Sequence, residues 1–240
     1  MSLTLRLTDE VAAAFPSALV GVVVAEGLRN DGPPFPGVEE GLAALEAEPP
    51  EYDEAAPAIA SWHAAYRAFG TNPRRMRPSV DALLRRLARQ GRLPRVNPAV
   101  DAYNLVSVRA AVPAGAFDLA GLDGRIDLRF AADGDVFTPL GEPDATERPN
   151  SGEVVYALGG TVLTRHWNHR DSDRTKVTAA SRDVVFLVER ASDAIAADTV
   201  RGAAGELAAV LGPHATVVRT TLLGPGDPPV TLTPGPVNGR

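Results

Sequence analysis

Apolar residues recur along the chain with two spacings, and each spacing predicts a different kind of element. Residues 19–25 are apolar almost throughout, which is typical of a fully buried strand. Residues 125–130 alternate charged and apolar side chains, which indicates a strand with one face in solvent. Further strands are predicted at 153–158, 162–165, 184–189 and 216–223. From residue 121 onward the chain is therefore expected to be mainly β.

Spacings of three and four residues predict helices, most of them in the first half of the chain. The predicted helices are a short one from Thr8 to Phe15-Pro16, then 38–48, 55–69, one that begins at Pro78-Ser79, 97–111 and 196–211. Ser79 and Asn97 are of the types that cap helix N-termini. Asn104 falls on an inward helix face, and a buried amide needs hydrogen-bond partners. Asn104 therefore either holds neighbouring backbone or lines a pocket.

The segment 165–178 concentrates polar chemistry between two predicted strands. It contains two of the four His, one of the two Trp and the single Lys, Lys176. Because Arg is used elsewhere in place of Lys, Lys176 indicates a site that requires a compact ammonium group. Neutral drift at a surface site explains the single Lys equally well. A polar connection between buried strands is a common place for function.

Composition limits the class of protein. The chain has 240 residues, no Cys and a formal net charge of -6. Without Cys there are no disulfides or thiolate metal sites, and nothing indicates secretion. The apolar part of the N-terminus is too short for a signal peptide, and no apolar run approaches a membrane span. We expect a cytoplasmic protein without membrane contact.

Charge is distributed unevenly along the sequence. Residues 39–54 include seven acidic side chains, whereas residues 67–95 include nine Arg and the single acid Asp81. Because exposed charges are screened beyond about 10 Å, a local basic patch can attract phosphate on an acidic protein. The alternative is a solvated helix face in a chain rich in Arg.

The common catalytic motifs are missing. The sequence has no phosphate-binding Gly loop, no Gly-x-Ser-x-Gly and no His-Glu-x-x-His. His166 and His169 are spaced by three residues, so on an extended segment they point to opposite faces. Residues 171–176 lack the Gly that a calcium loop needs, because Lys176 occupies its place. We therefore expect no metal and no cofactor.

Several of these segments together resemble one protein family. The segments are Tyr66-Arg67-x-Phe69-Gly70-x-Asn72-Pro73-x-Arg75-x-Arg77-Pro78-Ser79, Val100-Asp101-x-x-Asn104, Phe117-Asp118-Leu119, Leu128-Arg129-x-Ala131, Gly152-Glu153-Val154-Val155-Tyr156 and Trp167-Asn168-x-Arg170-Asp171-Ser172-x-x-Thr175. In order and spacing they resemble free-standing relatives of the tRNA-binding and editing domain of the bacterial phenylalanyl-tRNA synthetase β chain. The resemblance extends from about Gly21 to Val188.

In the synthetase, this domain hydrolyses tyrosine that has been wrongly esterified to the phenylalanine tRNA. The resemblance implies an α+β fold, a layered sandwich of packed β-sheets with flanking helices. It also implies one editing-like domain at 21–223, preceded by an N-terminal extension at 1–20. The Pro- and Gly-rich residues 224–240 are expected to form a disordered tail.

The resemblance further implies a site. Asn104 matches an Asn of the synthetase pocket, whereas Gly115 stands where the synthetase has a His, so a different pocket and a preference other than tyrosine are expected. The acidic residue that reads the tyrosine hydroxyl falls near 171–173. The expected substrate-binding residues are Asn104, Glu153, Asn168, Arg170 and Thr175. The expected tRNA-binding residues are Arg67, Asn72, Arg74, Arg75 and Arg77.

An aminoacyl ester is already activated, so its hydrolysis needs a positioned water and oxyanion donors but no strong nucleophile. We expect Asp171 or Asp173 to orient the water, with Lys176, Arg170 or Asn168 facing the oxyanion or the terminal ribose. The alternative is that Arg170, Asp171, Asp173 and Arg174 form an ion-pair network that braces the connection.

The expected function is trans-acting hydrolysis of mischarged aminoacyl-tRNA, which serves translation fidelity, with tRNA as the partner. No adenylate-forming motif is visible, so ligase activity is not expected. The identities of the amino acid and the tRNA, and the oligomeric state, are left open by the sequence. The alternative function is a non-catalytic module of the same fold that binds an amino acid or an RNA end.

Overall fold

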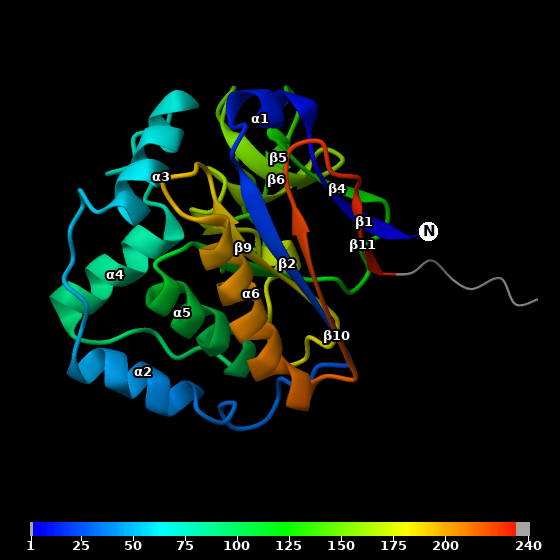
Figure 1. The fold of residues 1–240 in the computed structure, drawn as a ribbon. Helices are drawn as coiled ribbons and strands as arrows, with labels where there is room; N and C mark the ends of the chain where they lie inside the picture. Colours follow the sequence, from blue (N-terminus) through cyan, green and yellow to red (C-terminus); the bar gives the residue numbers. More distant parts are fainter. Residues whose placement is uncertain (1, 234–240) are drawn as a thin grey trace, which may run out of the picture.

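The fold consists of two packed β-sheets with flanking helices (Figure 1). The structure is a computed structural model, and it describes residues 2–233. Within these residues the larger sheet has seven strands in the order β11-β1-β4-β6-β7-β5, with β8 paired to β7. Its strands are β1 (Leu3–Leu7), β4 (Arg125–Phe130), β5 (Val136–Phe137), β6 (Val154–Leu158), β7 (Thr161–Arg165), β8 (Arg170–Asp171) and β11 (Val230–Thr233). The smaller sheet has the order β10-β2-β9-β3. Its strands are β2 (Leu19–Glu26), β3 (Ala114–Asp118), β9 (Val184–Arg190) and β10 (Val217–Leu223).

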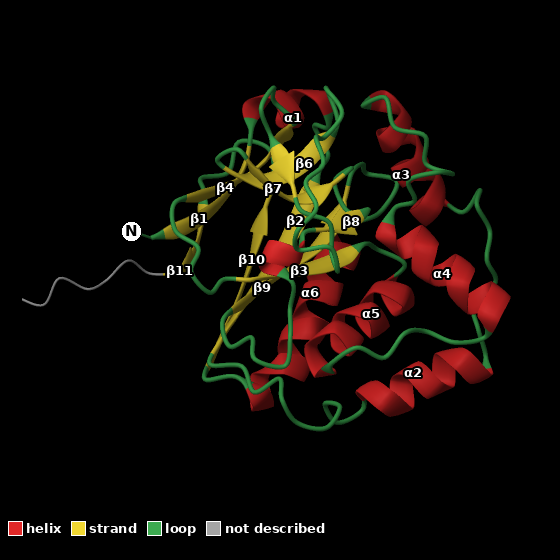
Figure 2. Cartoon of the chain, turned by 180° about the vertical axis from the view of Figure 1, so that it is seen from behind, coloured by secondary structure: helices red, strands yellow, loops and turns green. Residues whose placement is uncertain are grey.

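The longer helices gather at one side of the molecule, away from β1, β4 and β11 (Figure 2). The helices are α1 (Asp9–Ala14), α2 (Val38–Ala47), α3 (Pro57–Ala68), α4 (Ser79–Gln90), α5 (Pro98–Ala110) and α6 (Ala197–Leu211). Helix α6 packs against β2 where the strand has no side chain. A Cβ at Gly21 would lie 2.9 Å from the Cβ of Ala204, so only glycine allows this approach.

Burial on both faces explains the apolar runs of the smaller sheet. Helices α5 and α6 cover one face of this sheet. The larger sheet packs near the other face, where Phe117 of β3 and Tyr156 of β6 meet with ring centroids 5.6 Å apart. The predicted strands at 19–25 and 184–189 are therefore confirmed as core strands without the alternation of a half-exposed strand.

The first strand lies inside the larger sheet. Strand β1 pairs in parallel with β4 and antiparallel with β11. Residues 1–20 were expected to form an extension outside the main fold, but Leu3, Leu5 and Leu7 are buried. Leu alternates with polar residues over 3–7, which is the period-two pattern of a strand with one buried face. This pattern predicts a strand of the sheet better than the position of the segment at the start of the sequence predicts an extension.

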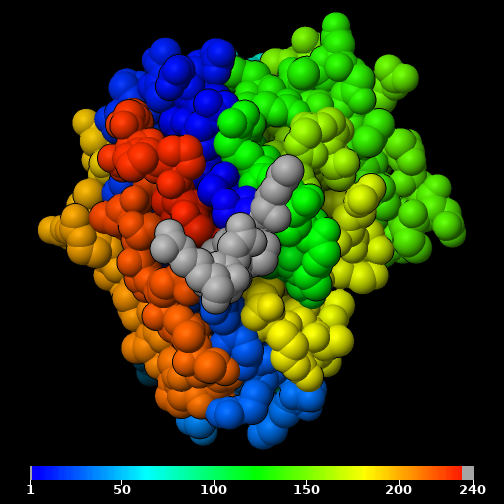
Figure 3. Space-filling view, turned by 90° about the vertical axis from the view of Figure 1, so that its right-hand side faces the viewer, coloured from blue at the N-terminus to red at the C-terminus, as the bar shows by residue number. Residues whose placement is uncertain are grey.

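The expected disorder from residue 224 is wrong for the part of the tail that the structure describes. Strand β11 pairs with β1, and Leu232 is fully buried. In Figure 3 the blue N-terminal part of the chain and the red C-terminal part of the described residues lie side by side on one face. The Pro and Gly residues at 224–229 lie between β10 and β11, in the turn that joins the two strands. Residues 234–240 lie outside the described part of the chain.

The predicted helices are confirmed within two residues at each predicted end. Asn97 caps α5, since its Oδ1 accepts a hydrogen bond of 3.1 Å from the Val100 N–H. Ser79 is not the cap of α4 but its first residue, because Pro78 precedes it in the extended conformation that the residue type favours. Strand β3 was not predicted, because its sequence Ala-Gly-Ala-Phe-Asp has little of the β-branched character of a strand.

Candidate functional site

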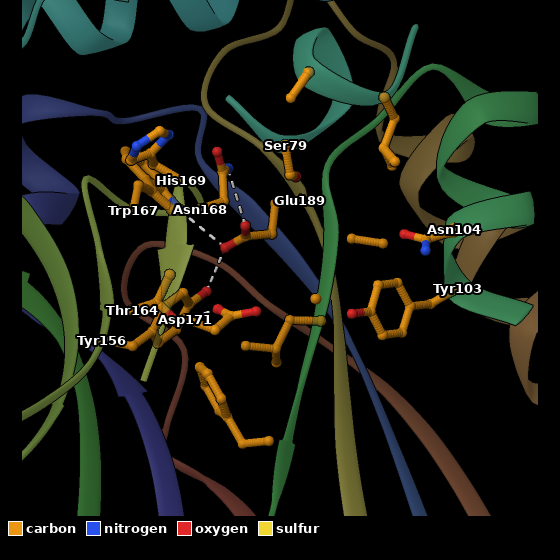
Figure 4. Close-up of a pocket in the computed structure, with 16 residues that line it drawn as sticks. Ser79, Tyr103, Asn104, Tyr156, Thr164, Trp167, Asn168, His169, Asp171 and Glu189 are labelled. Atoms are coloured by element: carbon orange, nitrogen blue, oxygen red, sulfur yellow. Dashed lines mark hydrogen bonds between the residues drawn. The ribbon is translucent and has the colours of Figure 1, made fainter. Parts of the chain in front are cut away.

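A cavity of about 210 Å³ lies where the two sheets meet α4 and α5 (Figure 4). Sixteen residues line it, and they come from α4, α5, β3, β6, β7, β8, β9 and the turn between β7 and β8. Elements distant in sequence therefore build one concave site, and the packing of the two sheets holds its walls in place.

Glu189 of β9 lies at the centre of a hydrogen-bond network in this cavity. Its Oε1 accepts hydrogen bonds from the Tyr156 hydroxyl and from Trp167 Nε1, the latter at 2.9 Å. Its Oε2 accepts one from Asn168 Nδ2 at 3.2 Å. The side chain is buried, and burial raises the pKa of Glu189 to about 7 although the three donors act to lower it. Tyr66 fixes the amide of Asn168, because its hydroxyl donates to Asn168 Oδ1 at 2.7 Å.

Asp171 of β8 supplies a second carboxylate. Its Oδ1 accepts a hydrogen bond of 2.8 Å from the Thr164 hydroxyl, and within residues 2–233 its Oδ2 has no hydrogen-bond donor. Burial raises the pKa of Asp171 from 3.8 to about 6. Compared with Glu189, Asp171 therefore has an oxygen that is free to bind a ligand or a water.

The turn between β7 and β8 positions three of the lining residues through an unusual backbone. His166 and Trp167 have φ angles of 48° and 69°, in the left-handed region that non-glycine residues rarely adopt. Packing offsets this strain, because the Trp167 ring lies edge-on to Trp62 at 5.1 Å and to Phe15 at 5.0 Å. The same packing directs Nε1 of Trp167 at Glu189.

His169, the last lining residue of this turn, has a defined tautomer. Its Nδ1 lies 2.8 Å from the carbonyl oxygen of Arg77. A carbonyl only accepts, so Nδ1 carries the proton, and burial lowers the pKa of His169 and keeps the ring neutral. Nε2 is then the nitrogen that is left to accept a hydrogen bond at the cavity edge.

The opposite wall is formed by α4 and α5. Asn104 is 6% exposed and lines the cavity, and its side chain makes no hydrogen bond within residues 2–233. Of the two roles that the sequence leaves open for Asn104, the structure therefore assigns the pocket wall. The Ser79 hydroxyl is likewise buried and lacks a partner among the described residues. Buried polar groups without protein partners are expected to meet a ligand or water.

The charge of the lining is one-sided. Glu189 and Asp171 both face the cavity, whereas no Arg or Lys of residues 2–233 lines it. Removal of two carboxylates from water without a cation is unfavourable, which explains why both pKa values are raised. The site is therefore an uncompensated acidic cavity whose free energy would fall if it received a positive charge.

Comparison with protein families decides the identity of the fold. A model described as the B3/4 domain matches residues 61–205, more than half of the chain. The chain belongs to the B3/4 domain family. The match extends from α3 to α6 and includes every residue that lines the cavity. The B3/4 domain is a domain of the phenylalanyl-tRNA synthetase β-subunit, so the expected relationship is confirmed.

Among solved structures, the B3/4 domain described here is similar to an N-terminal fragment of the phenylalanyl-tRNA synthetase β-subunit from Pyrococcus horikoshii. The two are 15% identical with a TM-score of 0.44, over 93% of this chain and 51% of the other. The chain thus spans about half the length of that fragment. No curated protein matches this sequence.

Three of the predicted site residues of this B3/4 domain come together in the cavity: Asn104, Asn168 and Asp171. Asp173 and Lys176 pair with each other at 2.9 Å, and neither lines the cavity. The single Lys of the chain is therefore a partly exposed ion-pair partner. Within residues 171–176, Asp171 alone lines the cavity, and its side chain accepts a hydrogen bond from Thr164 of β7.

The remaining predicted substrate contacts lie behind the cavity wall. Arg170 extends outward to Glu142 and Glu147, at 2.9 Å and 3.0 Å. Glu153 is buried and pairs with Arg165 at 2.9 Å. Thr175 is buried, and none of these predicted contacts lines the cavity. The ion-pair network expected among Arg170, Asp171, Asp173 and Arg174 does not form. Arg170 pairs with Glu142 and Glu147 and Asp173 pairs with Lys176, whereas Asp171 and Arg174 make no ion pair within residues 2–233.

The predicted tRNA contacts of the 67–77 segment are divided between free and paired arginines. Arg74 pairs with Glu54 at 2.8 Å and Arg77 with the buried Asp81 at 2.8 Å. Asn72 shapes the loop, since its side chain accepts a hydrogen bond from the Arg74 N–H. The other two, which are exposed and make no ion pair within residues 2–233, are Arg67 and Arg75. Half of the positive charge predicted for this loop is therefore neutralised.

Sequence reasoning missed the central residue of the site. Glu189 follows the apolar run 184–188, where a charged residue normally marks the end of a strand and its return to solvent. No local signal distinguishes it from such an end. Tyr103 was missed because only its neighbour Asn104 was considered as a polar residue on the inward face of α5. His169 was missed because it was considered only together with His166, as a possible pair of metal ligands.

The described residues contain no group of three or more His, Asp or Glu that could hold a metal ion. Within the same residues, no helix is long and apolar enough to cross a membrane.

Proposed function

We propose that this B3/4 domain binds the aminoacyl end of an aminoacyl-tRNA and hydrolyses its ester bond. The observation that carries the proposal is the charge of the cavity, with Glu189 and Asp171 facing it and no Arg or Lys lining it within residues 2–233. A free amino acid has a carboxylate beside its ammonium, and this cavity repels the carboxylate. Esterification to a ribose removes that charge and leaves only the ammonium, which the cavity attracts.

The size of the cavity fits the same ligand. A volume of about 210 Å³ is below the roughly 300–1,000 Å³ typical of sites that enclose a drug-sized molecule. It therefore accommodates one aminoacyl group and leaves the attached nucleotide outside. The family match to a synthetase domain supports tRNA as the source of the ester.

The two carboxylates are suited to different roles. Glu189 is held by three donors, so it is a fixed acceptor that can anchor the ammonium without reorganisation. Asp171 has a free oxygen and a pKa of about 6, which suits a group that orients water and accepts its proton near neutral pH. Burial thus gives Asp171 the basicity that this role requires.

Donors for the developing oxyanion are present on the opposite wall. The Asn104 amide and the Ser79 hydroxyl both lack partners within the described residues. Neither donor has to break a hydrogen bond within the described protein before it contacts the substrate, and a hydrogen bond to the ester oxygen strengthens as negative charge develops there. The site therefore requires no Ser or Cys nucleophile and no metal.

The test is hydrolysis of a panel of mischarged tRNAs by two matched variants. Asp171→Asn removes the water-orienting carboxylate, and we expect turnover to fall by on the order of a hundredfold. Asp173→Asn is the control, because Asp173 has the same side chain two residues away but lies outside the cavity and pairs with the partly exposed Lys176. We expect its turnover to stay within about threefold of the parent, since exposed ion pairs contribute little.

Equal turnover in the parent and in Asp171→Asn would refute this role of Asp171. Tight binding of aminoacyl-tRNA without hydrolysis of any member of the panel would instead support the non-catalytic module. Preference for free amino acids over their esters would contradict the charge argument itself.

A further inference from the structure

One face of α4 leads from the cavity mouth out to solvent. Ala82 is the one lining residue that is exposed, and it belongs to α4. Arg86 and Arg89 follow it by four and seven residues, so the three side chains lie within about 60° around the helix axis. Both arginines are exposed. A positive stripe, which we call the α4 track and define as Arg86 and Arg89, therefore begins at the opening of the site.

The charges of the α4 track are not neutralised by the protein. Within residues 2–233, neither Arg86 nor Arg89 makes an ion pair. Asp81, the only acid of α4, is buried and accepts hydrogen bonds from Tyr52 and Arg77, so it does not neutralise the track. Arg95, by contrast, pairs with two glutamates of α2. The track thus offers free guanidinium groups, which bind phosphate well.

We propose that the α4 track binds the phosphates of the single-stranded 3′ end of an RNA whose terminal aminoacyl group occupies the cavity. This proposal rests on the proposed function, because the ester fixes where the strand begins. Arg86 and Arg89 lie about 6 Å and 10 Å beyond Ala82 along the helix. At about 3.4 Å per stacked nucleotide, they lie opposite roughly the second and third nucleotides from the ester.

The α4 track explains how one protein accepts a cationic ester and an anionic strand. The acidic cavity attracts the ammonium and repels phosphate, whereas the track attracts phosphate outside the cavity. The negative field of the cavity and the positive field of the track are adjacent, because α4 lines the cavity at one end and carries the track beyond it. The RNA can therefore bind in one direction only, with its esterified end in the cavity. The loop at 67–77 is the competing surface, but two of its four arginines are already paired.

The experiment separates binding of the end from binding of the strand. The probes are the alanyl, seryl, tyrosyl and lysyl 3′-amides of adenosine, in which an amide replaces the labile ester, and a short single-stranded RNA that carries the same 3′-amides. The variants are Arg86→Glu/Arg89→Glu, the loop variant Arg67→Glu/Arg75→Glu, and the control Arg148→Glu/Arg201→Glu, which makes the same charge change at exposed arginines outside both surfaces.

We expect the Arg86→Glu/Arg89→Glu protein to bind the aminoacyl adenosines as the parent does and the RNA probe about tenfold or more weakly at about 0.1 M salt. The slope of log affinity against log salt should fall by about 1.4, which is about 0.7 for each of two lost phosphate contacts. The loop variant and the control should retain most of the parental affinity.

Each other outcome identifies what has failed. If the aminoacyl adenosines bind but Arg86→Glu/Arg89→Glu leaves RNA affinity and the salt slope unchanged, the α4 proposal is overturned and the proposed function stands. If the loss occurs in Arg67→Glu/Arg75→Glu instead, the strand follows the loop. If no aminoacyl adenosine binds to the parent, the proposed function fails and this proposal fails with it.

Discussion

At the scale of single residues, the cavity is a place where the protein is less stable than it could be. Glu189 and Asp171 are ionisable groups withdrawn from water without a cation, and their pKa values of about 7 and about 6 reflect the cost of charging them there. A fold selected for stability alone would place neutral side chains at these positions. Unfavourable buried charge is instead typical of a site that receives its counter-charge from a ligand.

Asp171→Asn should therefore stabilise the free protein in a manner that depends on pH. The pKa of Asp171 is higher in the folded chain than in the unfolded chain, so its favourable contribution is present below about pH 4 and is lost as pH rises through about 6. Asn does not titrate. Above about pH 7 the variant should be more stable by on the order of 2 kcal/mol, which raises Tm by roughly 4–8 °C.

Thermal unfolding of parent and variant at about pH 4 and about pH 8 tests this, with Asp173→Asn as the control. The pKa of Asp173 is lowered, chiefly by its hydrogen bond with Lys176, so the control should not gain stability at high pH. A Tm for Asp171→Asn below that of the parent at the higher pH would show that Asp171 is a structural partner and not a ligand site.

At the scale of elements, periodicity predicted the helices and the core strands because burial imposes it on many residues at once. The alternation in β4 and the cap at Asn97 are local signals of this kind. The cavity was only partly predictable, because Glu189 faces it through the pairing of β9 with β2 and β3, which no local pattern encodes. The left-handed backbone of Trp167 was unpredictable for a related reason, since packing against distant aromatic rings stabilises it.

Strand β3 contributes three lining residues to the cavity, and one of them, Gly115, allows a direct test of the space available to the ligand. A Cβ at Gly115 would have no atom within 4 Å, and the residue pairs in the extended register opposite Leu187. Gly115→Ala should therefore fold with unchanged or slightly higher stability, by up to about 1 kcal/mol. The added methyl group narrows the cavity, so affinity for the larger aminoacyl adenosines should fall more than affinity for the alanyl compound.

Isothermal titration with the alanyl and tyrosyl 3′-amides of adenosine measures this change in preference. Gly160→Ala is the matched control, because a Cβ there also meets nothing within 4 Å but lies in the turn between β6 and β7, outside the cavity. If Gly115→Ala lowers the affinity for both ligands equally, Gly115 does not lie next to the part of the cavity that holds the side chain of the bound amino acid.

At the scale of the whole molecule, the two ends of the described chain stabilise the same sheet. Strand β1 lies between β11 and β4, so the larger sheet joins segments separated by most of the sequence. Strands β6, β7 and β8 of that sheet carry Tyr156, Thr164 and Asp171 into the cavity. The stability of the terminal strands is therefore coupled to the geometry of the site through a continuous ladder of backbone hydrogen bonds.

Leu232→Ala tests the contribution of β11 to the stability of this sheet. The Leu232 side chain is fully buried, so its truncation should cost about 2–4 kcal/mol and lower Tm by roughly 4–16 °C. Chemical denaturation measures the loss, and Val217→Ala, which truncates an exposed residue of β10, is the control. A change below about 0.5 kcal/mol in Leu232→Ala would mean that the last strand is not bound to β1 in solution.

The position of β1 also has a consequence for biosynthesis. Leu3 pairs with Thr233 across 230 residues of sequence. At about 5–20 residues per second, roughly 10–45 s separate the emergence of these two strands from the ribosome. During that interval β1 has an unpaired edge and an alternating row of leucines, which are the features that promote intermolecular strand pairing. The nascent chain therefore passes through an aggregation-prone stage, and we expect its yield to depend on chaperones that shield β1 until β11 has emerged.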